Sequence, residues 1–170
     1  GNLSYLDTID GGAGTDIISV AQDVSDVDFM NVSNAETLTI DENASISTNV
    51  LGAYFNASGI TTVNLDPDNV STISASGTSG NITYDSKGNV AEAITAGLGD
   101  DNFLFDNTAT ITAADAIDGG AGTDTISLDN TAASVTAVIN IGDKVSNVEK
   151  IVVKDADGLA ASSAETFNIT

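Results

Sequence analysis

The stretch that decides the fold is Ile9-Asp10-Gly11-Gly12-Ala13-Gly14-Thr15-Asp16-Ile17-Ile18-Ser19-Val20, which returns at 117–128 as Ile-Asp-Gly-Gly-Ala-Gly-Thr-Asp-Thr-Ile-Ser-Leu. A weaker third copy runs over 96–105, as Ala-Gly-Leu-Gly-Asp-Asp-Asn-Phe-Leu-Phe. Each copy consists of a glycine-rich turn, an aspartate and an apolar segment. Because glycine permits positive φ angles, each copy predicts a tight turn that leads directly into a strand.

The repeat continues beyond this strand. Residues 32–40 read Val-Ser-Asn-Ala-Glu-Thr-Leu-Thr-Ile, and residues 145–153 read Val-Ser-Asn-Val-Glu-Lys-Ile-Val-Val. The segment 9–40 is therefore related to 117–153, either as a duplicated module or as parts of one continuous solenoid with irregular rungs. The strands predicted between 37 and 105 favour a single solenoid over residues 1–170, which we expect to be a fragment of a longer protein.

Short β-branched runs between polar turns predict an all-β chain. Only two segments, 89–96 and 112–117, look briefly helical. Phe103, Phe105, Ile126 and Leu128 are the side chains most strongly expected to point into the core. The predicted strands are Thr37–Ile40, Ile60–Leu65, Val70–Ala75, Asn81–Tyr84, Asn102–Phe105, Thr125–Leu128, Val135–Ile141 and Glu149–Val153.

The charge of the chain limits its partners and its chemistry. Twenty-five acidic residues stand against four lysines, which gives a formal net charge of −21. This balance argues against binding to nucleic acid or to an anionic membrane. No apolar run approaches the length of a membrane-spanning helix, so we expect no membrane insertion. The absence of cysteine and histidine removes the usual nucleophile–base pairs, and we do not expect an enzyme.

The same composition points to a hard, oxygen-binding cation. Carboxylates at this density repel one another, and a divalent ion relieves that repulsion. Ca²⁺ takes six to eight oxygen ligands, for which carboxylates and backbone carbonyls are suitable. Each turn has an alternative interpretation as a tight hairpin whose aspartate accepts backbone N–H groups. The overall charge has one as well, as an acidic surface that maintains solubility.

Residues 11–19 and 119–127 resemble the RTX (haemolysin-type) calcium-binding repeat, and the Val-Ser-Asn-x-Glu segments resemble those of RTX-like bacterial surface-layer proteins and large secreted adhesins. The resemblance implies a parallel β-roll that binds Ca²⁺ at its Gly-Asp-rich turns. It also implies that Asp16, Asp101 and Asp124 supply carboxylate ligands. Carbonyl ligands would come from the turns that hold them, at Gly11, Ala13, Gly97, Gly99, Gly119 and Ala121.

The spacing of the copies departs from a tandem RTX array. The second and third copies lie close enough for Asp101 and Asp124 to face one ion across adjacent rungs, whereas Asp16 has no evident partner. The sequence therefore predicts a few discrete ion sites within a β-roll-like solenoid.

The resemblance also implies where the protein works. We expect a structural calcium-binding module of a bacterial cell-surface protein of the surface-layer type, secreted by a type I system, that folds and self-assembles outside the cell. Its partners would be further copies, neighbouring domains of the same protein or a cell-surface glycan. The alternatives are an adhesin module that binds a carbohydrate or host surface, and the calcium-binding region of a secreted enzyme whose catalytic domain lies elsewhere.

Overall fold

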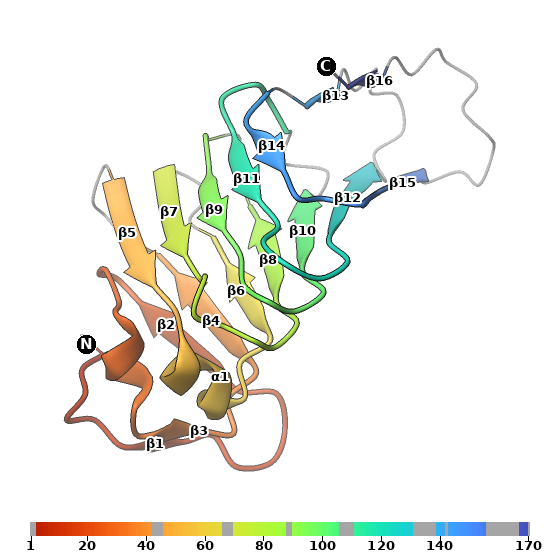
Figure 1. Ribbon diagram of the computed structural model, residues 1–170. Coiled ribbons are helices and arrows are strands. Elements are labelled where there is room, and N and C mark those ends of the chain that lie inside the picture. The colour runs from red at the N-terminus through yellow and green to blue at the C-terminus, as the bar shows by residue number, and fades with distance from the viewer. Residues whose placement is uncertain are drawn as a thin grey trace.

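The computed structural model describes residues 3–41, 46–65, 70–87, 90–105, 111–130, 139–141, 143–155 and 167–169. The chain winds into rungs of strand, turn and strand that stack along one axis, from the N-terminal end at the bottom of Figure 1 to the C-terminal end at the top. Every strand pair among these residues is parallel. The prediction of an all-β parallel solenoid is therefore confirmed.

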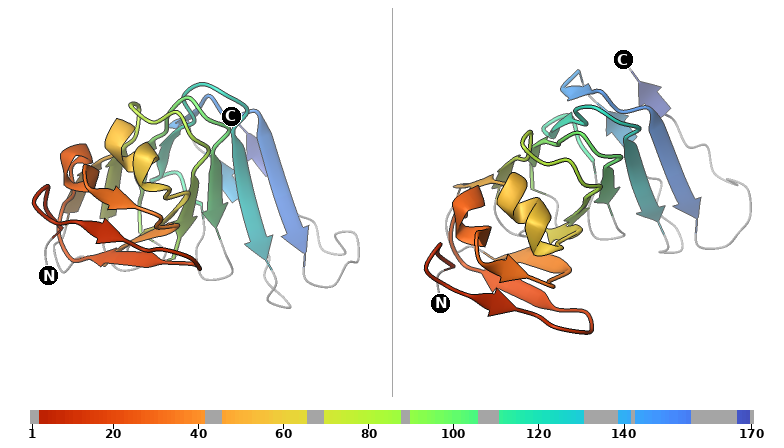
Figure 2. Two further views of the ribbon diagram at one scale, coloured as in Figure 1. Left: turned by 90° about the horizontal axis from the view of Figure 1, so that it is seen from below. Right: turned by 60° about the horizontal axis from the view of Figure 1, so that its bottom comes forward.

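Two parallel sheets form the walls of the solenoid (Figures 1 and 2). The seven strands of the first sheet, in spatial order, are β15 (Lys150–Asp155), β12 (Thr125–Asn130), β10 (Asn102–Phe105), β8 (Thr83–Ser86), β6 (Thr62–Asn64), β4 (Thr37–Ile40) and β2 (Ile17–Val20). The five strands of the second sheet are β14 (Val145–Ser146), β11 (Ala116–Asp118), β9 (Ala93–Thr95), β7 (Val70–Ser74) and β5 (Ile46–Val50).

Two small sheets complete the described strands. The first contains β1 (Ile9–Asp10) and β3 (Val32–Ser33), and the second contains β13 (Ile139–Ile141) and β16 (Phe167–Ile169). The seven-stranded sheet runs through both copies of the sequence repeat, since β2 follows the first turn and β12 follows the second.

The rungs differ in length. Partners in the seven-stranded sheet lie as few as 19 residues apart, as for Thr83 and Asn102, and as many as 25 apart, as for Thr125 and Lys150. Their inward side chains nevertheless keep one register. This alignment places side chains of successive rungs directly above one another, in the column Leu38, Val63, Tyr84, Phe103 and Ile126.

That column is the centre of the core. Each of its five side chains is at most 1% exposed, and the Tyr84 and Phe103 rings stack with centroids 5.4 Å apart. The opposite wall contributes a second column, Ile73, Ile94 and Ile117. Of the four core residues expected from the sequence, Phe103, Phe105, Ile126 and Leu128, all are buried. Each rung thus buries its apolar side chains only by stacking on its neighbours.

Two short helices lie beside the first rungs, near the N-terminal end. The 3₁₀ helix η1 (Asp26–Phe29) and the helix α1 (Ala53–Ser58) lie side by side (Figure 2), and the rings of Phe29 and Phe55 meet edge to face at 5.2 Å. The Asp26 carboxylate accepts the amide of Phe55 at 2.9 Å. An acidic acceptor at a helix N-terminus satisfies amides that have no partner within the helix.

The prediction of two short helical segments is wrong. In place of a helix at 89–96, residues 93–95 form β9, and in place of a helix at 112–117 a turn at 113–114 leads into β11. Both segments are rich in alanine, but their isoleucines are needed in the core columns, and stacking against neighbouring rungs outweighs local helix propensity. The part of the predicted strand Val135–Ile141 before residue 139 lies outside the described residues.

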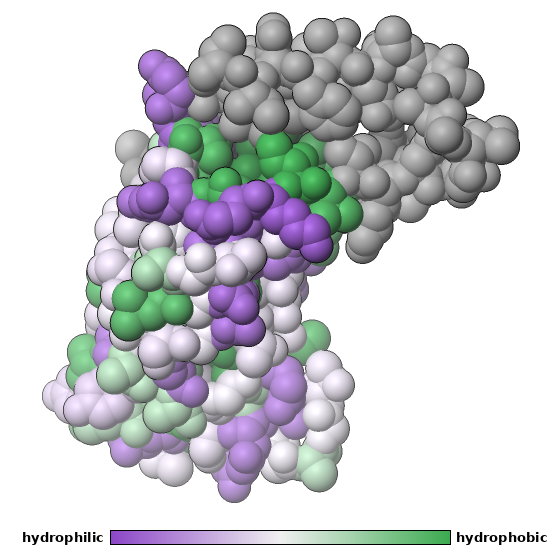
Figure 3. Space-filling view, turned by 45° about the vertical axis from the view of Figure 1, so that its right-hand side comes forward, coloured by the Kyte–Doolittle hydropathy of each residue, from purple (hydrophilic) through white to green (hydrophobic). Residues whose placement is uncertain are grey.

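Polar residues cover most of the face that Figure 3 presents, apart from the part drawn in grey. Figure 3 shows a largely white and purple face, with apolar surface gathered near the C-terminal rungs. No helix in the described part of the chain has the length and apolar character that a membrane span requires.

Candidate metal site

The two strong copies of the glycine turn have the same backbone geometry. Gly12 and Gly120 have φ angles of 85° and 86°, and Gly14 and Gly122 have φ angles of 138° and 136°. L-residues with side chains rarely adopt these angles, which explains the glycines. The turns connect β1 to β2 and β11 to β12, so they lie on the same side of the solenoid.

Each copy is also bound in the same way to the rung that follows it. The amide of Gly11 donates to the carbonyl of Ser33, and that of Gly119 donates to Ser146, both at 3.0 Å. A side chain at Gly119 would place its Cβ 1.9 Å from the carbonyl oxygen of Asn147. The first glycine of each turn therefore permits close contact with the next rung.

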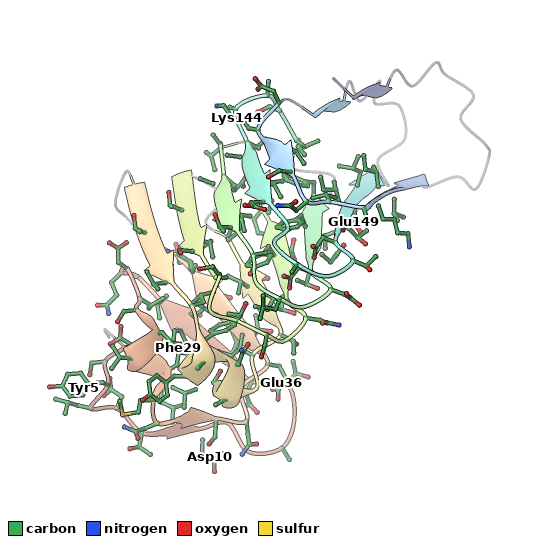
Figure 4. All side chains as sticks on the ribbon, in the orientation of Figure 1. Tyr5, Asp10, Phe29, Glu36, Lys144 and Glu149 are labelled. Atoms are coloured by element: carbon green, nitrogen blue, oxygen red, sulfur yellow. The ribbon has the colours of Figure 1, made fainter. Side chains whose placement is uncertain are left out.

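The Val-Ser-Asn-x-Glu segments provide two further bonds to each turn. The side-chain amides of Asn34 and Asn147 donate to Asp10 and Asp118 at 2.8 and 2.7 Å. A second pair of bonds joins Glu36 to the amide of Asp16 at 2.7 Å, and Glu149 to the amide of the matching aspartate at 2.8 Å. Figure 4 shows Glu36 near the N-terminal end of the solenoid and Glu149 near its C-terminal end.

These contacts belong to a column of acidic residues, each of which directly precedes a strand of the seven-stranded sheet. We call it the carboxylate column: Asp16, Glu36, Asp101, Asp124 and Glu149. From Glu36 onward, each member accepts the backbone amide of the register-equivalent residue on the preceding rung. Asp124 accepts the amide of Asp101 at 2.7 Å, and Asp101 accepts the amide of Ile82 at 2.8 Å.

Asp101 and Asp124 lie on adjacent rungs, as the sequence spacing suggested. Their contact is a backbone amide donated to a carboxylate. Both oxygens of Asp101 accept amides, from Ile82 and from Gly97 at 3.3 Å, whereas Asp124 uses only Oδ1. The remaining oxygen, Asp124 Oδ2, is buried and has no hydrogen-bond partner.

Asp16 lies far from this pair, because four strands separate β2 from β12 in the sheet. Its Oδ2 atom is nevertheless in the same condition as Asp124 Oδ2, buried and without a partner. A buried carboxylate oxygen without a donor is costly and is the kind of atom that a cation stabilises. The orphan oxygens therefore occur at the matching position of both strong copies.

Four of the six residues expected to supply carbonyl ligands differ in their surroundings, since two lie in close contact with a neighbouring rung and two are exposed. The Gly97 carbonyl already accepts the amide of Ala121 at 2.9 Å, and Gly99 packs so closely on Gly80 that an added Cβ would lie 2.4 Å from its carbonyl oxygen. Ala13 and Ala121 are exposed at the tips of their turns. Within the described residues, no three acidic side chains come together as a group able to hold a metal. An ion at these turns would need backbone oxygens in addition to the aspartate.

The electrostatic surroundings favour a cation at the second turn. Burial raises the pKa of Asp101 to about 6, and the nearby Asp124 and Asp100 carboxylates add to the rise. Burial also raises the pKa of Asp124, to which Glu149 and Asp100 contribute. Each shift records a carboxylate that is desolvated beside like charges, which a divalent ion would stabilise.

A second pair of buried acids was not expected from the sequence. Glu92 and Asp115 are 2% and 0% exposed, and the Glu92 amide donates to Asp115 Oδ1 at 2.9 Å. Glu92 accepts the Ser86 hydroxyl at 2.6 Å through Oε1, while its Oε2 has no partner. Burial, with Asp115 alongside, raises the pKa of Glu92 to about 8. No local motif marks this pair, because its members lie on different rungs.

Comparisons with protein-family models, with curated proteins and with solved structures each gave no match for this chain. The geometry of the turns is accordingly the basis for a functional proposal.

Proposed function

We propose that this chain is a structural calcium-binding module of a bacterial cell-surface protein, of the RTX-like surface-layer type, which folds and assembles outside the cell. The observation that carries the proposal is the orphan Oδ2 atom at both copies of the turn, on Asp16 and Asp124. Two matching turns each leave one buried anionic oxygen without a donor, in a chain with a net charge of −21.

Several residues of each turn would bind the ion together. Asp16 and Asp124 would provide the carboxylate ligands, and carbonyls of their own turns would complete the oxygen set that Ca²⁺ prefers. Bound calcium would neutralise charge that otherwise opposes stacking. Where calcium is scarce, that repulsion would leave the chain less stable, and calcium outside the cell would then favour folding.

The test is thermal unfolding of the full chain, followed by circular dichroism, in Ca²⁺, in Mg²⁺ and in chelator. The decisive variant is Asp124→Asn, because its Oδ1 can still accept the Asp101 amide while an NH₂ group replaces the orphan oxygen. Asp41→Asn is the matched control, since it removes one exposed carboxylate elsewhere. At a calcium concentration of 100 times Kd, a single site adds about 2.7 kcal/mol.

We expect Ca²⁺ to raise the Tm of the wild type and of Asp41→Asn, and to raise that of Asp124→Asn distinctly less. In chelator, Asp124→Asn should be at least as stable as the wild type, because the buried charge is gone. If Mg²⁺ acts as well as Ca²⁺ and all three proteins respond equally, the effect is general charge screening, and the proposed site is wrong.

The exposed aromatic residues provide little support for the adhesin alternative. Among the large hydrophobic residues exposed in the described chain, the aromatic ones are Tyr5 and Tyr54. A carbohydrate platform usually presents several aromatic faces together, and these two tyrosines belong to different elements, the N-terminal segment and α1.

A further inference from the structure

The outer face of the seven-stranded sheet carries a regular array of threonine. Five neighbouring strands of this sheet, β4, β6, β8, β10 and β12, keep one register (Figure 1). The residues that directly precede the central core column are therefore in line on all five strands, as Thr37, Thr62, Thr83, Asn102 and Thr125. Four of these five residues are threonine, so the same side chain recurs on nearly every rung.

A second column runs beside the first, two residues further along each strand. It consists of Thr39, Asn64, Asp85, Leu104 and Ser127. Because side chains alternate across a strand, both columns lie on the side of the sheet that faces away from the core. All ten residues are partly exposed, whereas the residues between them are buried. We call these ten residues the threonine face.

The threonine face has two short repeat distances. Neighbouring strands lie about 4.8 Å apart, and side chains two residues apart on one strand are separated by about 6.6 Å. The branched side chain of threonine has a restricted χ1 angle, so the strand holds its hydroxyl and methyl groups within a narrow range of positions. Hydroxyl groups on this face therefore repeat in two directions.

The hydroxyl groups of the first column are available to a partner. Within the described chain, no hydrogen bond involves the hydroxyl groups of Thr37, Thr62, Thr83 and Thr125. Other polar groups of the face bond to one another. The side-chain amide of Asn64 donates to the Thr39 hydroxyl at 3.1 Å, and the Ser127 hydroxyl donates to the side-chain oxygen of Asn102 at 2.6 Å. A threonine hydroxyl can both donate and accept, so the first column suits a partner that does the same.

The threonine face is nearly uncharged, although the chain as a whole has a net charge of −21. Its one acidic residue, Asp85, forms an ion pair with Lys87. The carboxylate column, in contrast, lies where the same strands begin. A cationic partner or an ionic mineral would be attracted to those acids rather than to this face. The composition of the face therefore favours an uncharged partner that forms hydrogen bonds.

Size and composition argue against two other kinds of partner. Five strands and four residues along each strand cover roughly 300 Å². A stable protein interface needs about 800 Å² on each partner, so the face is too small to hold a second copy of the chain. The face also contains no aromatic side chain on which a sugar ring could stack, which disfavours a polysaccharide.

We propose that the threonine face binds ice. Ice is an uncharged crystal, and its surface presents water molecules that both donate and accept hydrogen bonds. These molecules repeat in two directions, over distances close to those between the side chains of this face. Threonine hydroxyls would take the places of water molecules at the crystal surface, with the methyl groups between them. Because the sheet holds these side chains in position beforehand, little conformational entropy is lost on binding.

The five-stranded sheet provides an internal comparison. Two outward columns cross its strands β7, β9 and β11, and they consist of Thr72, Ala93 and Ala116, and of Ser74, Thr95 and Asp118. Neither column presents a hydroxyl group on every rung. A substitution on this sheet therefore changes the outer surface of the solenoid without changing the threonine face.

The test measures how the full chain partitions between slowly grown ice and the remaining liquid, and how far it lowers the freezing temperature below the melting temperature. The main variant is Thr83→Tyr, which places a bulky ring at the centre of the first column. Thr95→Tyr is the matched control, because it makes the same change at an exposed position of the other sheet. Tyrosine is favourable in strands, so both variants should keep the fold, which circular dichroism in Ca²⁺ verifies.

We expect the wild type and Thr95→Tyr to be enriched several-fold in the ice fraction, relative to a protein of similar size that does not bind ice. Both should also separate the freezing temperature from the melting temperature. Thr83→Tyr should be excluded from the ice although it is folded. Three results would overturn the proposal: exclusion of the wild type from ice, equal enrichment of Thr83→Tyr, or an equal loss in Thr95→Tyr.

Crystalline cellulose and chitin serve as competing surfaces in the same design. Binding to either polysaccharide, together with exclusion from ice, would assign the face to a glycan and would also overturn the proposal. All proteins are compared as folded chains in one buffer. The result is therefore independent of whether calcium binds at the turns.

Discussion

Replacing Gly12 or Gly120 by alanine separates backbone strain from rung stacking. The two glycines occupy the same place in the two turns, with φ angles of 85° and 86°. Alanine is strained equally at both. Only at Gly120 does the new Cβ meet another rung, 2.2 Å from the Gly97 carbonyl oxygen and 3.1 Å from that of Ala96.

The expected losses in the free energy of unfolding follow from the backbone strain, which both variants share, and from the contact with another rung, which only Gly120→Ala makes. A left-handed conformation costs an L-residue roughly 1–2 kcal/mol, so Gly12→Ala should lower the free energy of unfolding by about that amount. At Gly120 the backbone of two rungs must also move apart, and overpacking adds roughly 1–3 kcal/mol. Gly120→Ala should therefore cost about 2–5 kcal/mol. The reduced entropy of the unfolded chain is the same for both and cancels in the difference.

Urea unfolding of the wild type and both variants, with linear extrapolation to water, measures these values. Gly120→Ala should be the less stable variant by at least about 1 kcal/mol, since stacking is the only term that differs. Equal losses would show that the rungs at 97 and 120 are not in such close contact, and a larger loss for Gly12→Ala would show that a Cβ at this position is not free of contacts, contrary to the structure.

Two further predictions concern the core and the buried acids. Phe103→Ala should lower the free energy of unfolding by about 3–5 kcal/mol, while Leu104→Ala on the outer face of the same strand should cost much less, as urea unfolding would show. Because the pKa of Glu92 is raised to about 8 in the fold, the folded state holds a proton that the unfolded chain releases above its ordinary value of 4.5. The stabilisation of the fold by this bound proton is complete below pH 4.5 and is lost as the pH rises through about 8. The free energy of unfolding, measured across this pH range, should therefore fall less for Glu92→Gln than for the wild type.

The sequence predicts the architecture because its apolar alternation is local. Thr37–Ile40 and Asn102–Phe105 have the predicted bounds, since each strand has two inward apolar side chains at alternate positions. The second sheet was harder to predict. Strands such as β9 and β11 are three residues long, and each carries one core isoleucine, Ile94 or Ile117. A single apolar residue sets no period, so only stacking on the next rung defines these strands.

The site was predictable in part for a related reason. Repetition marked the aspartates of the turns, and the structure places each of them directly before a strand. The hydrogen bonds that hold these aspartates join neighbouring rungs, and paired residues on neighbouring rungs are 19 to 25 positions apart in the sequence. The pair Thr83 and Asn102 has the shorter separation, and the pair Thr125 and Lys150 has the longer one. Irregular intervals of this kind leave no fixed spacing in the sequence. The roles of Glu36 and Glu149 as acceptors for turn amides therefore became evident only from the register.

The carboxylate column explains how so acidic a chain can stack at all. Where the turn has six residues the column uses aspartate, at 101 and 124, and where it has three residues it uses the longer glutamate, at 36 and 149. In each case a charge-assisted bond to a backbone amide offsets part of the repulsion between rungs. Asp16 is the member of the column whose carboxylate receives no such amide, although its own amide is held by Glu36. Its orphan carboxylate is therefore the place in the column where a bound ion would supply the positive partner that a backbone amide supplies to the other members.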